Sequence, residues 1–159
     1  MTTQTEETAV QTSTEVDASP ERAFHVFTAE MASWWPADKH ILEAPLAEMV
    51  VEPRVGGRIL DRGTDGSECQ WARVLAYEPP ERFAFSWDIT SSWQIETDPD
   101  RASEVEVRFV ALDGGRTRVE LEHRHLDRHG DGWEGMRNAV GSPNGWSDGL
   151  RAFAAAVGG

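Results

Sequence analysis

The sequence predicts an α+β fold in which one curved antiparallel sheet wraps around a long C-terminal helix. From residue 46 to residue 126, apolar and polar residues alternate with a period of two, in short segments separated by turn residues. From residue 142 to residue 157, apolar residues instead recur at helical spacing. The apolar stripe of that helix has to be buried, and the dry face of the sheet is the large surface available to it.

The segment before residue 46 is expected to supply one strand and one helix. Residues 1–7 are polar and predict a flexible tail, so a single domain is expected to span residues 8–159. Alternation over residues 10–16 predicts a half-buried strand. Ser19 is a good N-cap and Pro20 suits the first helical position, so a helix should begin here. The apolar stripe of this helix consists of Ala23, Phe24, Phe27 and Met31.

Six further strands are expected, joined by turns that are rich in glycine and proline. The turn signals include PRVGG, GTDGS, EPPE and LDGG, and each connection is short enough for a hairpin. The sheet should therefore be an antiparallel meander. In the last two strands every second residue is charged, which predicts one dry face and one charged face. The expected strands lie near residues 46–52, 57–62, 67–77, 81–90, 102–112 and 116–126.

The chain is expected to close with two helical segments. The shorter one covers residues 131–141 and is weakened by glycine. In the longer one, residues 142–157, Ser142 is expected to cap the helix and Pro143 to open it. Its apolar stripe consists of Trp146, Leu150, Phe153, Ala154 and Val157.

Charge and composition exclude several classes of partner. The formal net charge is -13 and the pI is about 4.7, so the long-range field repels phosphate backbones and anionic lipid surfaces. We therefore expect neither nucleic acid nor a membrane as a partner. No apolar run approaches the roughly 20 residues of a membrane span and the N-terminus lacks a secretion signal, so a cytoplasmic location is expected. Cys69 is the only cysteine, which excludes an internal disulfide.

Seven segments, in the order of the chain, resemble one known superfamily. They are VDASPERAFHVFT, WW, VEPRVGGR, VLAYEPPERFAFSW, VEVRF, GRTRVELEH and a late GW. Together they resemble the START-like (SRPBCC) superfamily and, within it, the family of activator of Hsp90 ATPase homologue 1-like proteins. The resemblance implies a helix-grip fold with a cavity between the sheet and the last helix. It also implies that this cavity takes up an apolar small molecule and that no cofactor is needed.

Two segments carry a narrower resemblance. LEHRHLDRHG and RNAVGSPNGW are similar to segments of the START-like proteins that protect producers of enediyne antibiotics by binding the drug. This similarity implies sequestration of a ligand or antibiotic self-resistance. We expect the chain to bind an apolar, aromatic or polycyclic small molecule without metal or cofactor, rather than to act as an enzyme.

Tryptophan is the unusual component of this chain. Its 7 Trp stand against 1 Tyr, which favours contact area over hydroxyl chemistry. Adjacent helical residues point about 100° apart, so Trp34 and Trp35 cannot share one environment. We assign Trp34 to packing and Trp35 to the mouth of the pocket, with the alternative that both indoles only plug the open end of the sheet. The candidate ligand-binding residues are Trp35, Trp71, Phe85, Trp87, Phe109, His123, His125, Met136, Trp146 and Leu150.

Three histidines stand close together in the segment HRHLDRH. His123 and His125 are two apart on an expected strand, so both imidazoles would lie on one face. A zinc site would need a third well-placed ligand, and His129 lies beyond the expected end of the strand. We therefore expect no metal, and we expect His123 and His125 to give an apolar cavity a polar end.

Two other functions stay open. START-like relatives include polyketide cyclases, and His123, His125, Arg73 and Arg137 could enolise or dehydrate a bound poly-ketone if they face inward. The family resemblance also implies an Hsp90 co-chaperone-like interaction domain. The eukaryotic activator uses a separate N-terminal domain, however, and a short polar tail stands in that place here. The sequence has no nucleophile motif of the G-x-S-x-G kind, so no catalytic residue is assigned.

Overall fold

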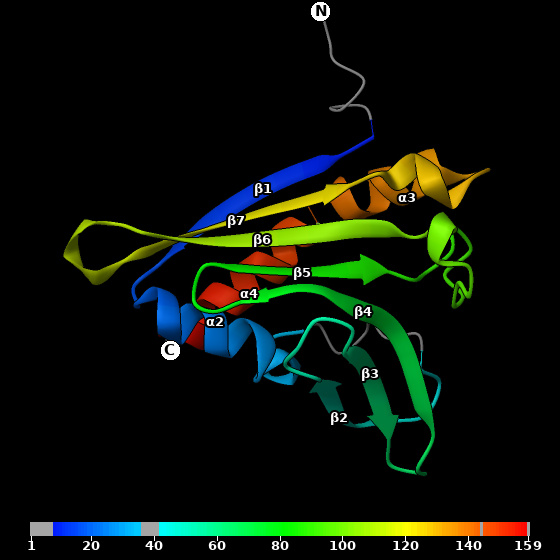
Figure 1. The fold of residues 1–159 in the computed structure, drawn as a ribbon, viewed down its shortest axis with the longest axis horizontal. Coiled ribbons are helices and arrows are strands. Elements are labelled where there is room, and N and C mark those ends of the chain that lie inside the picture. The colour runs from blue at the N-terminus through cyan, green and yellow to red at the C-terminus, as the bar shows by residue number, and fades with distance from the viewer. Residues whose placement is uncertain (1–7, 36–41, 144, 159) are drawn as a thin grey trace, which may run out of the picture.

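The structure, a computed structural model, describes residues 8–35, 42–143 and 145–158. It has the predicted α+β architecture, in which a curved antiparallel sheet grips the C-terminal helix (Figure 1). This arrangement is the helix-grip fold. The tail expected at residues 1–7 lies outside the described residues, so its flexibility stays a prediction.

Seven strands form one sheet with the order β1-β7-β6-β5-β4-β3-β2. Every neighbouring pair is antiparallel, so β2 to β7 make the expected meander and β1 pairs with its last strand. Two strands end earlier than predicted, β5 at Trp87 and β7 at Arg124. The strands are β1 (Val10–Val16), β2 (Leu46–Val51), β3 (Arg58–Gly63), β4 (Glu68–Glu78), β5 (Arg82–Trp87), β6 (Ser103–Ala111) and β7 (Thr117–Arg124).

Helices α2 (Pro20–Thr28) and α4 (Trp146–Gly158) pack on the inner face of the sheet, and α3 (Trp133–Gly141) lies beside β1 (Figure 1). The start of α2 is confirmed, because Ser19 Oγ accepts a hydrogen bond from the backbone N–H of Arg22 at 3.2 Å. The predicted stripes of α2 and α4 are buried except for Ala154, which is half-buried. The described residues also form four short 3-10 helices, η1 (Met31–Ser33), η2 (Pro99–Arg101), η3 (Asp113–Gly115) and η4 (Leu126–His129).

The predicted start of the last helix is wrong. Ser142 is the C-cap of α3, and its hydroxyl donates to the backbone carbonyl of Ala139 at 2.8 Å. The hydroxyl therefore satisfies a carbonyl at the end of one helix instead of an N–H at the start of the next. The last helix begins four residues later, at Trp146.

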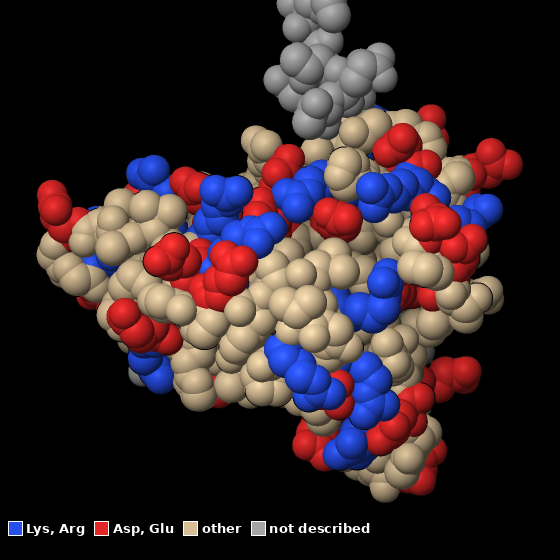
Figure 2. All heavy atoms as spheres, in the orientation of Figure 1, with Lys and Arg blue, Asp and Glu red and all other residues tan. Residues whose placement is uncertain are grey.

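The sheet has one apolar face and one charged face, as the alternation predicts. The side chains of Val105, Val107 and Phe109 are buried beneath the helices. Figure 2 shows the opposite face, on which acidic and basic side chains are interspersed. Glu106 is only 6% exposed although it belongs to this charged face, because arginines surround it. The core therefore lies between the inner face of the sheet and the helices.

Candidate ligand-binding site

Five tryptophans from four parts of the fold form one cluster between the sheet and α4. Trp34 and Trp35 follow η1, Trp71 lies in β4, Trp87 ends β5 and Trp146 begins α4. The ring centroid of Trp35 lies 5.0 Å from that of Trp71 and 5.7 Å from that of Trp146. Trp87 lies 5.9 Å from Trp71 and 5.6 Å from Trp146, both edge-to-face. We call these five residues the tryptophan cluster.

The two adjacent tryptophans have different surroundings. Trp34 is 3% exposed, and its Nε1–H donates to the backbone carbonyl of Val26 at 3.1 Å. Its ring packs on Phe27 and Phe153, which confirms its assignment to packing. Trp35 is only partly buried, and it touches Trp34 as well as Trp71 and Trp146. Its role at a pocket mouth stays a prediction.

A chain of hydrogen bonds lies against the tryptophan cluster. Trp146 Nε1–H donates to His123 Nδ1 at 3.0 Å. Ser103 Oγ lies 2.7 Å from His123 Nε2 and 2.7 Å from His129 Nε2. All four side chains are buried, and the ring of Trp87 packs on His123 at 5.0 Å between centroids. We call Trp146, His123, Ser103 and His129 the polar chain.

Both histidines of the polar chain are neutral near pH 7. Burial, with a smaller contribution from the neighbouring His129, lowers the pKa of His123 to about 3. Burial also lowers the pKa of His129, although Glu96 and Asp88 act in the opposite direction. A neutral imidazole has one N–H donor and one acceptor nitrogen. The position of each proton in the polar chain can therefore be deduced from the hydrogen bonds that the rings make.

Two buried nitrogen atoms, one beside the polar chain and one at its end, have no hydrogen-bond partner among the described residues. They are the indole Nε1 of Trp87 and the imidazole Nδ1 of His129. Trp87 is 6% exposed and His129 is 3% exposed. Buried polar atoms without a partner are rare in proteins and are commonly satisfied by a ligand or a water molecule. This end of the core therefore has unused hydrogen-bonding capacity.

The predicted ligand-binding residues divide into groups. Phe109 packs on Phe24 and Phe27 beneath α2, at ring distances of 5.3 Å and 5.9 Å, and so belongs to a different part of the core. Met136 of α3 and Leu150 of α4 are buried in the same continuous core. Six of the ten form one set of neighbouring rings, namely Trp35, Trp71, Phe85, Trp87, His123 and Trp146.

The inward orientation predicted for His125 is wrong. β7 ends at Arg124, and His125 is exposed with a left-handed backbone conformation, φ 62°. The alternation of the strand therefore stops before it could place His125 beside His123. Within the described ranges, no three His, Cys, Asp or Glu side chains gather as metal ligands. That the protein needs no metal stays a prediction.

His129 and Ser103 are the functional candidates that the sequence reasoning missed. His129 occupies the last position of η4, three residues after the buried Leu126. Side chains three apart in a 3-10 helix share one face, so the pair could have indicated that His129 points inward. Ser103 stands directly opposite Trp87 in the pairing of β5 with β6. Nothing in its sequence surroundings distinguishes this serine from an ordinary strand residue.

The two arginines of the cyclase hypothesis make other contacts. Arg73 forms two hydrogen bonds with the carboxylate of Asp88, each 3.0 Å long. The guanidinium of Arg137 lies over the ring of Trp133, 5.1 Å from its centroid. Both arginines therefore make contacts with residues outside the polar chain. The polar chain itself lies within the core.

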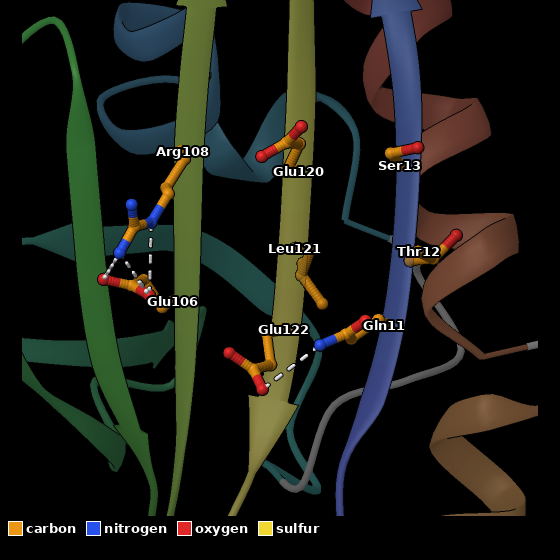
Figure 3. Close-up of a pocket in the computed structure, with 8 residues that line it drawn as sticks. All are labelled: Gln11, Thr12, Ser13, Glu106, Arg108, Glu120, Leu121 and Glu122. Carbon is orange, nitrogen blue, oxygen red and sulfur yellow. Dashed lines mark hydrogen bonds and ion pairs between the residues drawn. The ribbon is translucent and has the colours of Figure 1, made fainter. Parts of the chain in front are cut away.

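Three surface depressions outlined by the described residues lie away from the tryptophan cluster. The one in Figure 3 crosses β1, β7 and β6 on the outer face of the sheet. Glu106, Arg108, Glu120 and Glu122 contribute charged groups to its lining. A lining of this kind does not suit an apolar ligand, so we place the candidate site at the tryptophan cluster.

Comparisons with known proteins found solved structures that are similar to this chain. No curated protein sequence matches it. Among solved structures, it is similar to "an anthrahydroquino-γ-pyrone synthase Txn09 complexed with SUM", with 43% identity, a TM-score of 0.66, and coverage of 93% of this chain and 96% of that one. It is also similar to the self-sacrificing resistance protein CalC from Micromonospora echinospora, with 29% identity, a TM-score of 0.66, and coverage of 95% and 94%.

More distant structures share the fold alone. Protein NE0264 from Nitrosomonas europaea is 14% identical, with a TM-score of 0.67 and coverage of 98% of this chain and 97% of that one. No helix among the described residues is both long and apolar enough to cross a membrane. The profile of the Activator of Hsp90 ATPase homolog 1-like proteins matches residues 17–158, so the chain belongs to this family of the START-like superfamily.

Proposed function

We propose that this chain binds a planar, polycyclic aromatic molecule between the sheet and α4. The observation that carries the proposal is the tryptophan cluster, in which five indoles gather beside one buried polar chain. Flat aromatic rings stack or pack edge-to-face with one another, so such a cluster suits a flat aromatic ligand. A core that only needed to be filled could use aliphatic side chains, which bring no polar atoms with them.

The similarity to Txn09 supports a more specific ligand class. That protein is described as a synthase of an anthrahydroquino-γ-pyrone, and 43% of its aligned residues are identical to those of this chain. We therefore propose that the ligand is a fused aromatic ring system that carries carbonyl or hydroxyl oxygens. Tryptophan rings would contact its faces, and the polar chain would lie near its oxygens.

Trp35 is the side chain whose movement would admit the ligand with the smallest rearrangement. It is partly exposed, whereas Trp71 and Trp146 are buried beneath it. Its ring contacts both of them. A ligand that took the place of the Trp35 indole would therefore reach both buried indoles at once.

Binding could serve protection against a toxic compound. CalC is described as a self-sacrificing resistance protein, and its 29% identity with this chain extends over 95% of this chain and 94% of CalC. We propose sequestration of an aromatic natural product as the purpose of binding. Under this proposal the complex should persist without turnover of the ligand.

Ring closure is the second candidate function, and the similarity to Txn09 favours it. Closing a γ-pyrone joins a hydroxyl oxygen to a carbonyl carbon with loss of water, which needs proton transfer at both oxygens. The polar chain holds a serine hydroxyl between two neutral imidazoles at 2.7 Å each. The test is to incubate the protein with a hydroxyanthraquinone bearing an adjacent 1,3-diketone chain, and to look for a product lighter by one water.

The binding proposal is tested by titrating the protein with dihydroxyanthraquinone and following tryptophan fluorescence and heat. We expect saturable one-to-one binding that Trp35→Ala weakens. Trp93→Ala is the matched control, because Trp93 is 45% exposed and lies in the loop between β5 and β6. Absence of saturation, or equal weakening by both variants, would reject the proposed site. Mass spectrometry of small molecules extracted from the native protein would then identify the natural ligand.

A further inference from the structure

Only one arrangement of protons in the polar chain gives both the Trp146 indole N–H and the Ser103 hydroxyl proton an acceptor. An indole N–H only donates, so His123 Nδ1 must accept from Trp146 and the proton of His123 must be on Nε2. His123 Nε2–H then donates to Ser103 Oγ. If His129 also donated to Ser103 Oγ, the buried Ser103 hydroxyl would have no acceptor for its own proton among the described residues, so this hydroxyl donates to His129 Nε2. His129 therefore carries its single proton on Nδ1.

The opposite arrangement is excluded by Trp146. If His129 donated toward Ser103 and Ser103 toward His123, then His123 would have to accept at both ring nitrogens. A neutral imidazole has only one acceptor nitrogen. The burial that lowers the pKa of His123 also disfavours a doubly protonated ring, which would lose the acceptor that Trp146 needs. The Trp146 indole thus fixes the His123 tautomer, and the single proton of the Ser103 hydroxyl fixes the direction of the bond to His129.

The polar chain consequently ends in a donor. His129 Nδ1–H is buried and meets no acceptor in the described part of the chain, and the same holds for Trp87 Nε1–H. The two donors belong to one region, because Trp87 stands opposite Ser103 in the sheet and packs its ring on His123. Neither group can act as an acceptor in this arrangement. A partner for them must therefore present oxygen or nitrogen lone pairs.

We propose that Trp87 Nε1–H and His129 Nδ1–H bind carbonyl oxygens of the ligand, so that the site selects quinone-type aromatics over aromatic hydrocarbons of the same shape. This inference rests on the proposed function and deepens it, because it names the ligand chemistry that the site recognises. His129 acts as a hydrogen-bond donor here and not as a general base. Ser103 and His123 act by positioning it.

The proton arrangement itself can be tested without a ligand. Long-range nitrogen–proton NMR correlations distinguish the two neutral tautomers of each histidine. We expect His123 to carry its proton on Nε2 and His129 on Nδ1 at pH 7. A His129 ring protonated on Nε2, or on both nitrogens, would overturn the inference whatever ligand the protein binds.

The selectivity is tested with two probes of equal shape, hydroxymethyl-anthraquinone and hydroxymethyl-anthracene, by isothermal titration calorimetry. We expect the quinone to bind more tightly by about threefold to tenfold for each donor engaged. Equal affinities would leave the proposed function standing and overturn this inference. If neither probe binds, the proposed function fails and the inference fails with it.

The variant for this test is Trp87→Phe, which removes the indole N–H without breaking a hydrogen bond, because Trp87 Nε1 has no partner among the described residues. It should lower quinone affinity by about threefold to tenfold more than it lowers anthracene affinity, because both probes lose the same ring contact and only the quinone loses a hydrogen bond. Trp93→Phe makes the same chemical change at an exposed indole and should alter neither affinity. If Trp87→Phe does not fold, NMR of the wild-type protein provides a second test. The indole N–H resonance of Trp87 should shift downfield when the quinone is added and should not do so when the anthracene is added. A resonance that both probes shift equally contradicts the proposal.

Discussion

The indole Nε1–H of Trp146 donates a hydrogen bond to Nδ1 of His123 across 3.0 Å, and this bond joins the first residue of α4 to strand β7. Both side chains are buried, at 5% and 0% exposure. The bond therefore has two consequences. It helps to hold the C-terminal helix on the sheet, and it sets the tautomer of a histidine in the candidate site.

Trp146→Phe should show how much this hydrogen bond stabilises the fold, because phenylalanine keeps an aromatic ring but has no donor. A buried acceptor without its partner costs about 1 to 3 kcal/mol, so we expect the free energy of unfolding to fall by that amount. Urea denaturation measures it. Trp133→Phe is the control, because Trp133 is only partly buried at the start of α3. A loss in Trp146→Phe no larger than that of the control would contradict the role of the hydrogen bond.

The two adjacent tryptophans should separate stability from binding. Trp34→Ala removes a buried indole and should lower the free energy of unfolding by about 3 to 5 kcal/mol. Trp35→Ala should leave the fold nearly intact and weaken binding of dihydroxyanthraquinone by about 1 to 2 kcal/mol, the scale of one aromatic contact. Thermal melts compare the stability of the two variants, and fluorescence titrations compare their affinity for dihydroxyanthraquinone.

The opposite result would exchange the roles of the two indoles. If both variants lose stability equally and bind the probe as the wild type does, then Trp34 and Trp35 only plug the open end of the sheet. That outcome would also remove the main support for ligand access past Trp35.

The sheet could be predicted from the sequence because its signal is local. Alternation with a period of two fixes which residues of β6 and β7 face the core, and each hairpin turn carries its own glycine or proline signal. The end of β7 could not be predicted in this way. His125 follows the alternation in sequence, but its left-handed backbone turns the chain into η4. A positive φ at a non-glycine residue depends on surroundings that the sequence does not display.

The candidate site was predictable only in its apolar part. Trp87 and Trp146 stand at inward positions of regular elements, so periodicity indicates that both face the core, whereas Trp71 lies at an irregularity in the pairing of β4 with β3. The polar chain instead depends on a contact between distant segments, since Ser103 and His129 are 26 positions apart. Arg101 helps to hold η4 in place by donating to the carbonyl of His129 at 3.3 Å. Such contacts arise from tertiary packing, which no local pattern encodes.

Stability should fall as the pH is lowered from 7 to 5. The pKa of His123 is about 3 in the folded state, below its ordinary value of 6.5, so the unfolded chain binds a proton that the folded chain excludes. The stabilisation is therefore complete above pH 6.5 and is lost toward pH 3, at about 1.4 kcal/mol per pH unit for one proton. His129, whose pKa is also lowered by burial, should steepen the slope. Urea denaturation at a series of pH values measures this slope.

A histidine variant identifies the source of that slope. His123→Gln removes the titrating group and should flatten the dependence between pH 7 and pH 5, even if the variant is less stable throughout. His25→Gln is the matched control, because the side chain of His25 is 58% exposed on α2. If both variants keep the wild-type slope, His123 is not the group that resists protonation.

On the outer face of the sheet, the carboxylate of Glu106 should stabilise the fold more than the other carboxylates do. Glu106 accepts hydrogen bonds from Arg82 and Arg124. Burial alone would raise the pKa of Glu106, but these hydrogen bonds lower it to about 2 from the ordinary value of 4.5. This stabilisation is thus present above pH 4.5 and is lost as the pH falls toward 2.

Glu106→Gln should therefore lower the free energy of unfolding at pH 7 by about 1.5 to 3 kcal/mol, the contribution of hydrogen bonds to a charged group. Glu120→Gln makes the same change on the same face, where the side chain is 45% exposed and its ion pair with Arg118 is 4.0 Å long. It should alter stability by less than about 0.5 kcal/mol, as exposed pairs do. Urea denaturation at pH 7 and at pH 3 compares the two variants, and the difference between them should shrink at the lower pH. Equal losses at pH 7 would show that Glu106 stabilises the sheet no more than an ordinary surface carboxylate.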